Sequence, residues 1–404
     1  MTEVTITHLD QHGFGQSEAG QKLPRTLPGE VIVLDADTGK QRVVTPSEHR
    51  ISAPCRHFKN CGGCAMQHAA DDFVANWKMG IVKTGLAARG IEARMRPIKT
   101  SPPNSRRRAT LHGRRTKSGA LVGFHARASD MVVEVPDCKL LHPDLLKTVP
   151  VLAEITKMAG SRKGEIGFAL TMSEGGVDLD VRGAKATDLD MLTRLGELAD
   201  RADLARLSWE AEPIATRRAP YQRFGQARVV PPPGAFLQAT PQGESALVAA
   251  VQEAVGDASR VVDLFAGCGT FALSLASDAE ILAVEAEAAP LQALDAAWRA
   301  TPGLRHVATL VRDLFRQPLL PDELGKFDAV VIDPPRAGAE AQIRAVADAQ
   351  VPVIAAVSCN PVSFARDARI LLDAGYGLDW VQVVDQFRWS THVELVARFS
   401  RNCG

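Results

Sequence analysis

Three apolar segments in the C-terminal part of the chain each run directly into a tight turn, and this pattern constrains the fold more than any other feature. The turns that follow them are Ala266-Gly267-Cys268-Gly269, Asp333-Pro334-Pro335 and Ser358-Cys359-Asn360-Pro361. Helical patterns separate these segments, and strands that alternate with helices are typical of a parallel α/β sheet. We therefore predict a Rossmann-like domain whose turns meet at the carboxyl edge of the sheet, where such domains bind ligands.

The length and composition suggest several domains. The chain has 404 residues, of which 46% are hydrophobic and 23% charged, so it carries enough apolar surface for more than one core. We predict a small β-barrel in residues 1–50, a mixed α+β part in residues 51–210 and the α/β part in residues 211–404. Helical patterns cover residues 71–89 and 189–202. No segment approaches the roughly 18 apolar residues that cross a bilayer, so we expect a soluble, cytoplasmic protein.

Basic residues are concentrated in one segment. Lys plus Arg equals Asp plus Glu, at 47 each, so the whole-chain charge does not indicate a polyanionic partner. Between Arg89 and Arg127, however, eleven basic residues face a single acid, Glu92. Glycines and β-prone residues interrupt them, which predicts an arginine-studded hairpin that binds nucleic acid. A solvated charged loop is the alternative.

Three of the seven cysteines form a cluster, Cys55-x5-Cys61-Gly62-Gly63-Cys64. Clustered cysteines in a cytoplasmic protein indicate a metal site rather than disulfides, and the paired glycines allow the backbone to fold tightly around it. Cys138, which follows a predicted strand, is the candidate fourth ligand. The site is expected to hold either an iron-sulfur centre or a structural zinc, the latter with four sulfurs or with His57 or His68 as a ligand.

The glycine-rich turn after Leu264 predicts a nucleotide-type cofactor. Glu285 ends the next predicted strand, 22 residues after Asp263, where a carboxylate accepts hydrogen bonds from ribose hydroxyls. Nicotinamide nucleotides and S-adenosylmethionine fit this arrangement equally well. The Asp-Pro-Pro turn at Asp333 favours a methyltransferase.

Two further residues stand at positions that bear on chemistry. Cys359 ends a strand at the same edge as Asp333; a lone cysteine there is usually a small core residue, and a catalytic nucleophile is the alternative. Glu394 lies in an otherwise apolar segment, and a carboxylate there is costly unless it has a partner or a task.

Together these residues resemble the RNA uracil-5-methyltransferases, and among them the iron-sulfur-containing members that modify 23S ribosomal RNA. The resemblance implies a class I S-adenosylmethionine-dependent methyltransferase domain, an N-terminal TRAM-like or OB-like barrel and a central iron-sulfur domain. It implies catalysis by Cys359 and Glu394, and S-adenosyl-L-methionine contacts from Gln238, Phe265, Thr270, Glu285 and Asp333. It also implies that a [4Fe-4S] cluster is held by Cys55, Cys61, Cys64 and Cys138.

The implied reaction is methylation of carbon 5 of a specific uridine in 23S rRNA, with transfer RNA as the alternative substrate. An amino-group methyltransferase, a non-catalytic RNA-binding module and a nicotinamide oxidoreductase with an iron-sulfur centre are the competing interpretations. Arg336 and Cys359 disfavour the first, since such enzymes commonly place an aromatic residue after the prolines and need no cysteine. We expect a monomer without a protein partner.

Overall fold

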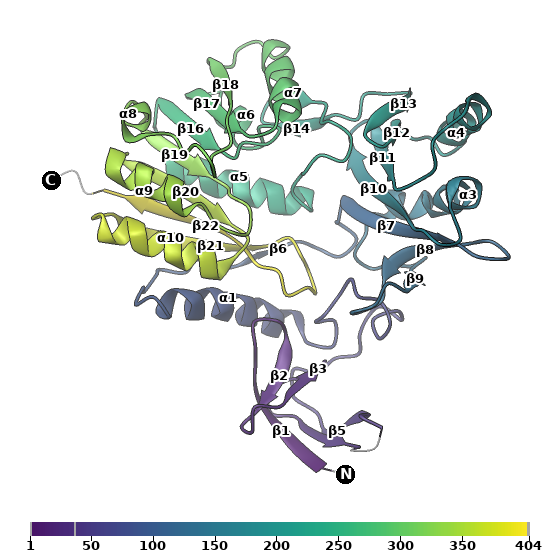
Figure 1. Cartoon of the computed structure of the whole chain (residues 1–404). Helices are drawn as coiled ribbons and strands as arrows, with labels where there is room; N and C mark the ends of the chain where they lie inside the picture. Colours follow the sequence, from purple (N-terminus) through teal and green to yellow (C-terminus); the bar gives the residue numbers. More distant parts are fainter. Residues whose placement is uncertain (1, 36–37, 402–404) are drawn as a thin grey trace.

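The computed structural model describes residues 2–35 and 38–401. Cys403, one of the seven cysteines, lies outside the described residues. The described residues form three larger sheets and one two-stranded hairpin (Figure 1): the larger ones are a small N-terminal sheet, a central seven-stranded sheet and a C-terminal eight-stranded sheet. No helix in the described part of the chain is long and apolar enough to cross a membrane.

The N-terminal sheet is antiparallel, with the strand order β3-β2-β1-β4-β5. Its strands are β1 (Thr2–Leu9), β2 (Phe14–Ser17), β3 (Lys22–Pro24), β4 (Val31–Leu34) and β5 (Gln41–Thr45). Val4, Ile6 and Ile32 form its core. Within the described residues no backbone ladder joins β3 to β5, so the expected barrel is not closed by strand pairing. The Gln41 side chain spans the two edges, with Nε2 donating to the Pro24 carbonyl over 2.7 Å.

The central sheet has the order β13-β12-β11-β10-β7-β8-β9. The strands are β7 (Arg108–Arg115), β8 (Ala120–His125), β9 (Val132–Glu134), β10 (Ile166–Ser173), β11 (Gly176–Arg182), β12 (Arg206–Trp209) and β13 (Glu212–Thr216). Three helices accompany it, α2 (Pro143–Lys147), α3 (Val149–Ala159) and α4 (Leu189–Arg201). Buried residues such as Leu152, Ile155 and Leu195 join α3 and α4 to the core of this sheet.

The C-terminal sheet has the order β18-β17-β16-β19-β20-β22-β21-β6. Its strands are β6 (Lys99–Thr100), β16 (Arg260–Leu264), β17 (Glu280–Glu285), β18 (Val307–Val311), β19 (Ala329–Ile332), β20 (Val353–Ser358), β21 (Gly377–Asp385) and β22 (Glu394–Ser400). Strands β16 to β20 pair in parallel, and β22 is antiparallel to both of its neighbours. A short hairpin, β14 (Gln222–Phe224) and β15 (Ala227–Val229), precedes the sheet.

Helices cover both faces of this sheet (Figure 1), as the sequence predicts for a Rossmann-like domain. One core lies under α5 (Pro241–Val255), α6 (Ala272–Leu275) and α7 (Ala288–Arg299). The other lies under α1 (Asp71–Ala87), α8 (Pro321–Leu324), α9 (Glu340–Ala349) and α10 (Pro361–Asp373). Fully buried strands explain the continuous apolar runs in the sequence.

Two elements of the predicted central part pack on the C-terminal sheet instead. Helix α1 contributes Val82 and Leu86 to the core beneath α10, and β6 pairs in parallel with β21. Residues 71–100 thus connect the cysteine segment to the C-terminal sheet. The predicted central and C-terminal parts, divided at residue 210, are therefore in extensive contact. The three domain ranges predicted from the sequence remain predictions.

Candidate active site and cysteine site

Cys359 and Glu394 meet because β20 and β22 run in opposite directions. Cys359 follows the last residue of β20, whereas Glu394 is the first residue of β22. Ser358 pairs with Leu395, so the next residue along each strand in this direction is Cys359 on one strand and Glu394 on the other. Asp333 follows the last residue of β19, which pairs in parallel with β20. All three predicted residues therefore lie at one edge of the sheet.

Burial controls the protonation of these groups. Glu394 is only 5% exposed, and burial, reinforced by the nearby Asp333 carboxylate, raises its pKa to about 8. Burial likewise raises the pKa of Asp333 to about 7. The pKa of the Cys359 thiol is raised to about 11 by burial and by both carboxylates, and Arg336 opposes this shift. A carboxyl group with a pKa near neutrality is suited to accept and release a proton.

A residue that the sequence analysis missed connects the predicted base to a predicted cofactor residue. Gln386 donates from Nε2 to Oε2 of Glu394 over 3.0 Å and to Oε1 of Gln238 over 2.6 Å. Its own oxygen accepts from the Ala239 amide over 2.7 Å. Gln238 in turn donates to Oδ2 of Asp333 over 3.4 Å. Gln386 comes directly after β21, at the sheet edge where the other site residues lie. Its position at the end of a strand is the sequence feature from which it could have been predicted as a site residue.

The glycine-rich turn lies at the same edge, between β16 and α6. Phe265 adopts a positive φ of 63°, and a Cβ on Gly269 would approach the Leu294 side chain to 2.6 Å. The Glu285 carboxylate accepts from the Gly267 amide over 3.0 Å, which holds this turn against the end of β17. Thr270 completes the turn. The positions of Phe265, Thr270 and Glu285 are therefore compatible with a ligand at the turn.

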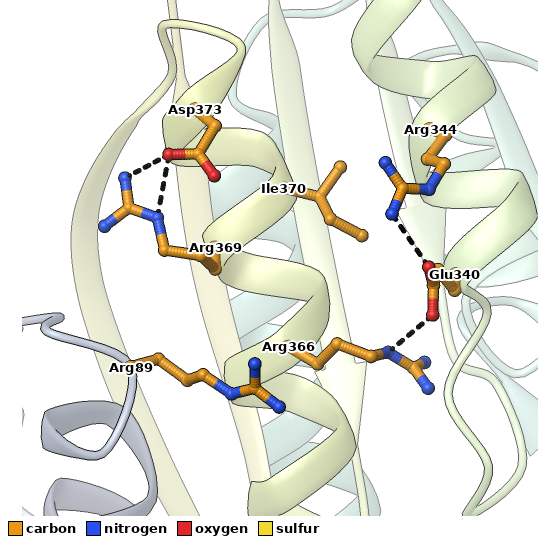
Figure 2. A pocket seen from close by; sticks show the side chains of 7 residues that line it. All are labelled: Arg89, Glu340, Arg344, Arg366, Arg369, Ile370 and Asp373. Atoms are coloured by element: carbon orange, nitrogen blue, oxygen red, sulfur yellow. Dashed lines mark hydrogen bonds and ion pairs between the residues drawn. The ribbon is translucent and has the colours of Figure 1, made fainter.

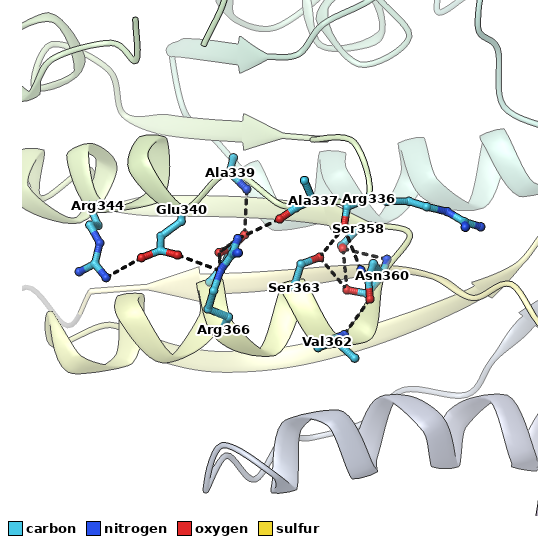
Figure 3. A network of polar contacts seen from close by, with 11 residues as sticks. Arg336, Ala337, Ala339, Glu340, Arg344, Ser358, Asn360, Val362, Ser363 and Arg366 are labelled. Atoms are coloured by element: carbon cyan, nitrogen blue, oxygen red, sulfur yellow. Dashed lines mark hydrogen bonds and ion pairs between the residues drawn. The ribbon is translucent and has the colours of Figure 1, made fainter. Parts of the chain in front are cut away.

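A polar network holds the turn after Cys359 against the turn after Asp333 (Figure 3). The Asn360 side chain caps α10 by accepting from the Val362 amide over 3.0 Å, and it donates to the Arg336 carbonyl over 2.8 Å. Ser363 donates to the same carbonyl over 3.1 Å. Both functions of the Asn360 amide are thus used within the protein, so it serves to position Cys359.

The loop between β21 and β22, which precedes Glu394, is held from two sides. The Trp389 carbonyl accepts from the amides of Ala65 and Met66 over 2.7 and 2.9 Å, immediately after Cys64. On the other side, the buried Lys78 of α1 pairs with Asp385 at the end of β21 over 2.6 Å and donates to the Phe387 carbonyl of the loop over 3.1 Å. The cysteine segment therefore contacts the loop that leads into the predicted base.

The four predicted cysteine ligands line one cavity, together with Phe58, Phe124 and other apolar residues. Cys55, Cys64 and Cys138 are buried, and the pKa of Cys64 is raised to about 12 by burial and by the other three thiols. Backbone amides of Gly63 and Leu140 donate to the sulfurs of Cys61 and Cys138 over 3.4 Å each. Convergent buried sulfurs with amide donors are the donor set that a metal centre or iron-sulfur cluster requires.

The two histidines considered as zinc ligands do not line this cavity. His57 directs Nε2 to Asp137 over 2.7 Å, and the His68 ring stacks on Phe58. The geometry therefore favours four sulfur ligands. Gly62 is required next to them, since a Cβ there would lie 2.9 Å from the His125 carbonyl.

The basic segment serves two purposes. Arg107, counted among its cations, is buried: it forms an ion pair with Glu244 and donates to the Gln238 carbonyl over 3.1 Å. Arg127 donates to the Cys64 carbonyl over 2.9 Å. Arg114 and Arg115, at the end of β7 in the predicted hairpin, are exposed. Only part of the predicted cationic surface is therefore available to a nucleic acid.

A hollow of about 460 Å³ lies on the outer side of α9 and α10, away from the predicted site residues (Figure 2). Four arginines line it, but Arg344 and Arg366 pair with Glu340, and Arg369 pairs with Asp373. The two carboxylates balance two of the four arginine charges. None of the predicted site residues lines it.

Relatives of known sequence cover nearly the whole chain, although no protein-family model matches it. An uncharacterised RNA methyltransferase of Brucella suis is 40% identical over 401 residues, which are 98% of this chain and 97% of that protein. The 23S rRNA (uracil(1939)-C(5))-methyltransferase RlmD of Shewanella halifaxensis is 30% identical over 428 residues, covering 98% of this chain and 95% of that protein.

A solved structure has the same fold. The Pyrococcus abyssi tRNA (uracil-54, C5)-methyltransferase, in complex with S-adenosyl-L-homocysteine, superposes with a TM-score of 0.77 at 21% sequence identity. The superposition covers 98% of this chain and 99% of that one. The likeness therefore extends over nearly the whole chain.

Proposed function

The chain belongs to the RNA uracil-C5 methyltransferase family, and from this premise we propose that it methylates carbon 5 of a uridine in 23S ribosomal RNA through a covalent adduct with Cys359. The observation that carries the proposal is the antiparallel pairing of β20 and β22, which brings a cysteine and a buried carboxylate together. Such a pair supplies a nucleophile and a base at one point. An amino-group methyltransferase would need neither.

The proposed reaction uses Cys359 first. Its thiolate adds to carbon 6 of uracil, forming a C–S bond and an enolate whose carbon 5 is nucleophilic. S-adenosylmethionine supplies the methyl group that carbon 5 takes up. Burial and two carboxylates hold the thiol protonated in the free protein. The thiol must therefore release its proton to solvent before the attack, and Arg336 favours this ionisation.

Glu394 then completes the reaction. The ionised carboxylate removes the proton from carbon 5, the electron pair restores the C5–C6 double bond, and the Cys359 sulfur leaves. Gln386 holds Glu394 in position by donating to Oε2 over 3.0 Å. The C5–H bond and the C6–S bond break in this step, and the enzyme regains a thiolate and a protonated Glu394.

We assign the methyl donor to the edge formed by the glycine-rich turn. Gln238, Phe265, Thr270, Glu285 and Asp333 are its proposed contacts. Glu285 is held at the end of β17 by the Gly267 amide, at the place where a parallel α/β sheet binds a ribose. Gln238 and Asp333 lie between this turn and Cys359, so they are suited to orient the methyl donor toward the target uracil.

We also propose that Cys55, Cys61, Cys64 and Cys138 hold a [4Fe-4S] cluster with a structural role. Their shared cavity and the amide donors to two of the sulfurs support this assignment. The cluster would stabilise the segment that hydrogen bonds to Trp389. The end of β7, which carries Arg114 and Arg115, is the proposed RNA contact.

Two measurements test the function. The purified protein with S-adenosylmethionine should release tritium from RNA that contains 5-tritiated uridine, and methyl transfer to an adenine or guanine amino group would release none. The substrate is identified by mapping 5-methyluridine in total RNA from a deletion strain. Loss of a methyl group from 23S rRNA supports the proposal, whereas loss confined to transfer RNA would assign the enzyme to that substrate.

A further inference from the structure

Two histidines and a carboxylate converge on the central sheet, outside the cysteine cavity and the proposed active site. His112 lies in β7, His125 ends β8, and Glu165 directly precedes β10. His112 Nδ1 lies 2.7 Å from Oε1 of Glu165, and His125 Nε2 lies 2.9 Å from the same oxygen. The two imidazole rings stack with their centroids 3.8 Å apart. Two nitrogens are thus directed at one carboxylate oxygen.

The sheet register produces this convergence. His112 pairs with Gly123 on β8 and with Gly167 on β10. His125 and Glu165 each stand two residues from one of these glycines, so they lie on the same face as His112, as diagonal neighbours. Phe124, which alternates with His125, lines the cysteine cavity on the other side of β8. The three side chains therefore occupy a face that the cysteine site does not use.

We propose that His112, His125 and Glu165 form a binding site for a divalent transition metal of the zinc class. Two imidazoles and one carboxylate are an established ligand set for zinc, with bonds of about 2.0–2.1 Å. Tetrahedral geometry with such bonds separates the ligand atoms by about 3.3 Å. The three ligand atoms lie within 4.8 Å of one another, so small side-chain rotations suffice to surround an ion.

The site is accessible to an ion and to a water ligand. The side chains of His112, His125 and Glu165 are 26%, 34% and 23% exposed. Three protein ligands leave one tetrahedral position for water. The ligands come from three neighbouring strands of the sheet (Figure 1), so the metal would cross-link β7, β8 and the start of β10. This role is independent of the proposed methyl transfer.

The test uses the whole 404-residue chain, purified anaerobically so that the centre proposed for the cysteine site is retained. Zinc is titrated in competition with a chromogenic chelator, and one further zinc ion per chain is expected to bind. His125→Ala and Glu165→Gln should each weaken this binding at least about tenfold. Glu165→Gln keeps an oxygen that accepts from both imidazoles, so it separates metal binding from a merely structural hydrogen bond. His12→Ala, at an exposed histidine of the N-terminal sheet, is the matched control.

A second readout identifies the ligands. Cu²⁺ added at one equivalent should give an electron paramagnetic resonance spectrum with coupling to two imidazole nitrogens, and His112→Ala should reduce it to one. Zinc should also raise the thermal unfolding midpoint of the wild type and leave that of Glu165→Gln unchanged. Zinc binding that survives both His125→Ala and Glu165→Gln, or zinc bound only after loss of the cysteine-site centre, would overturn the proposal.

Discussion

Gln386 Nε2 lies 3.0 Å from Oε2 of Glu394, so the proposed base accepts a hydrogen bond in a site from which water is largely excluded. The same amide nitrogen donates to Gln238. This hydrogen bond lowers the pKa of Glu394, against the larger effect of burial, which raises it. Gln386 therefore positions the base and also adjusts the pH range in which the base is ionised.

Replacing Gln386 should change the pH profile of the reaction. In Gln386→Leu, Glu394 loses its donor, its pKa rises further, and the acidic limb of kcat moves to higher pH. We expect kcat at pH 7 to fall about tenfold to a hundredfold. Gln386→Glu keeps an oxygen for the Ala239 amide but adds a negative charge beside Glu394. This variant should therefore move the acidic limb of kcat to a still higher pH. If Gln386→Glu restored the wild-type profile, Gln386 would have only a structural role. Gln252→Leu, at a glutamine of α5, is the control.

Glu394→Gln should trap the covalent intermediate. Cys359 still attacks and the methyl group still moves, but the proton on carbon 5 stays in place and the RNA remains bonded to the enzyme. Turnover should fall at least about a hundredfold. With a labelled methyl donor, a denaturing gel should show a slowly migrating labelled band for Glu394→Gln and none for Cys359→Ala. A band that persists in Cys359→Ala would identify another nucleophile, for which the buried Cys268 is the candidate.

Glu394→Gln should also stabilise the protein at alkaline pH. The folded state holds the proton of Glu394 up to a pKa of about 8, whereas the unfolded chain releases it near the ordinary value of 4.5. The raised pKa of Glu394 therefore contributes to the free energy of unfolding. This contribution is complete below pH 4.5 and is lost as the pH rises through 8. Glutamine cannot ionise, so at pH 9 the variant should gain on the order of 2 kcal/mol in the free energy of unfolding.

Urea unfolding at pH 4.5 and pH 9 measures this difference, which should be small at the lower pH. Glu92→Gln, at an exposed glutamate, provides the reference for loss of a surface charge. Equal effects of the two substitutions at pH 9 would contradict a raised pKa at Glu394. Asp333 stays in the variant, so part of the pH dependence should remain.

Loss of the cysteine-site centre should loosen the loop before Glu394. Cys64→Ser removes one of the four proposed sulfur ligands, and the neighbouring amides of Ala65 and Met66 hold the Trp389 carbonyl. We expect loss of iron, together with faster hydrogen exchange in residues 386–393, measured by mass spectrometry. Cys268→Ser, at a buried cysteine outside the cavity, should retain iron and slow exchange. Unchanged exchange in iron-free Cys64→Ser would show that the two segments are independent.

Two arginines of the basic segment should respond in opposite ways. Arg107→Met leaves Glu244 buried without its partner, so it should cost about 3–5 kcal/mol of stability. Arg114→Ala removes an exposed charge and should leave the unfolding midpoint unchanged. It should instead weaken RNA binding and reduce the slope of log affinity against log salt by about one. An unchanged salt slope would exclude Arg114 from the RNA surface.

Much of the site was predictable because the chemistry follows strand ends. Asp333 and Cys359 end apolar runs in the sequence, and parallel strands bring their carboxyl ends to one edge, so the C-terminal sheet and its two turns were predicted as observed. The cysteine spacing likewise predicted a metal site at Cys55, Cys61 and Cys64, with Cys138 as the candidate fourth ligand, and all four of these residues line one cavity. The family that the motifs resemble is the family to which the chain belongs.

Other relationships depended on contacts between distant segments. The sequence shows Glu394 as a carboxylate in an apolar run, but only the antiparallel register of β22 sets it beside Cys359. Arg107 is one cation among eleven until the fold buries it against Glu244. His112, His125 and Glu165 share no local motif, because strand pairing rather than sequence spacing brings them together. Local patterns determine which residues end a strand, whereas pairing and packing determine which of those residues meet.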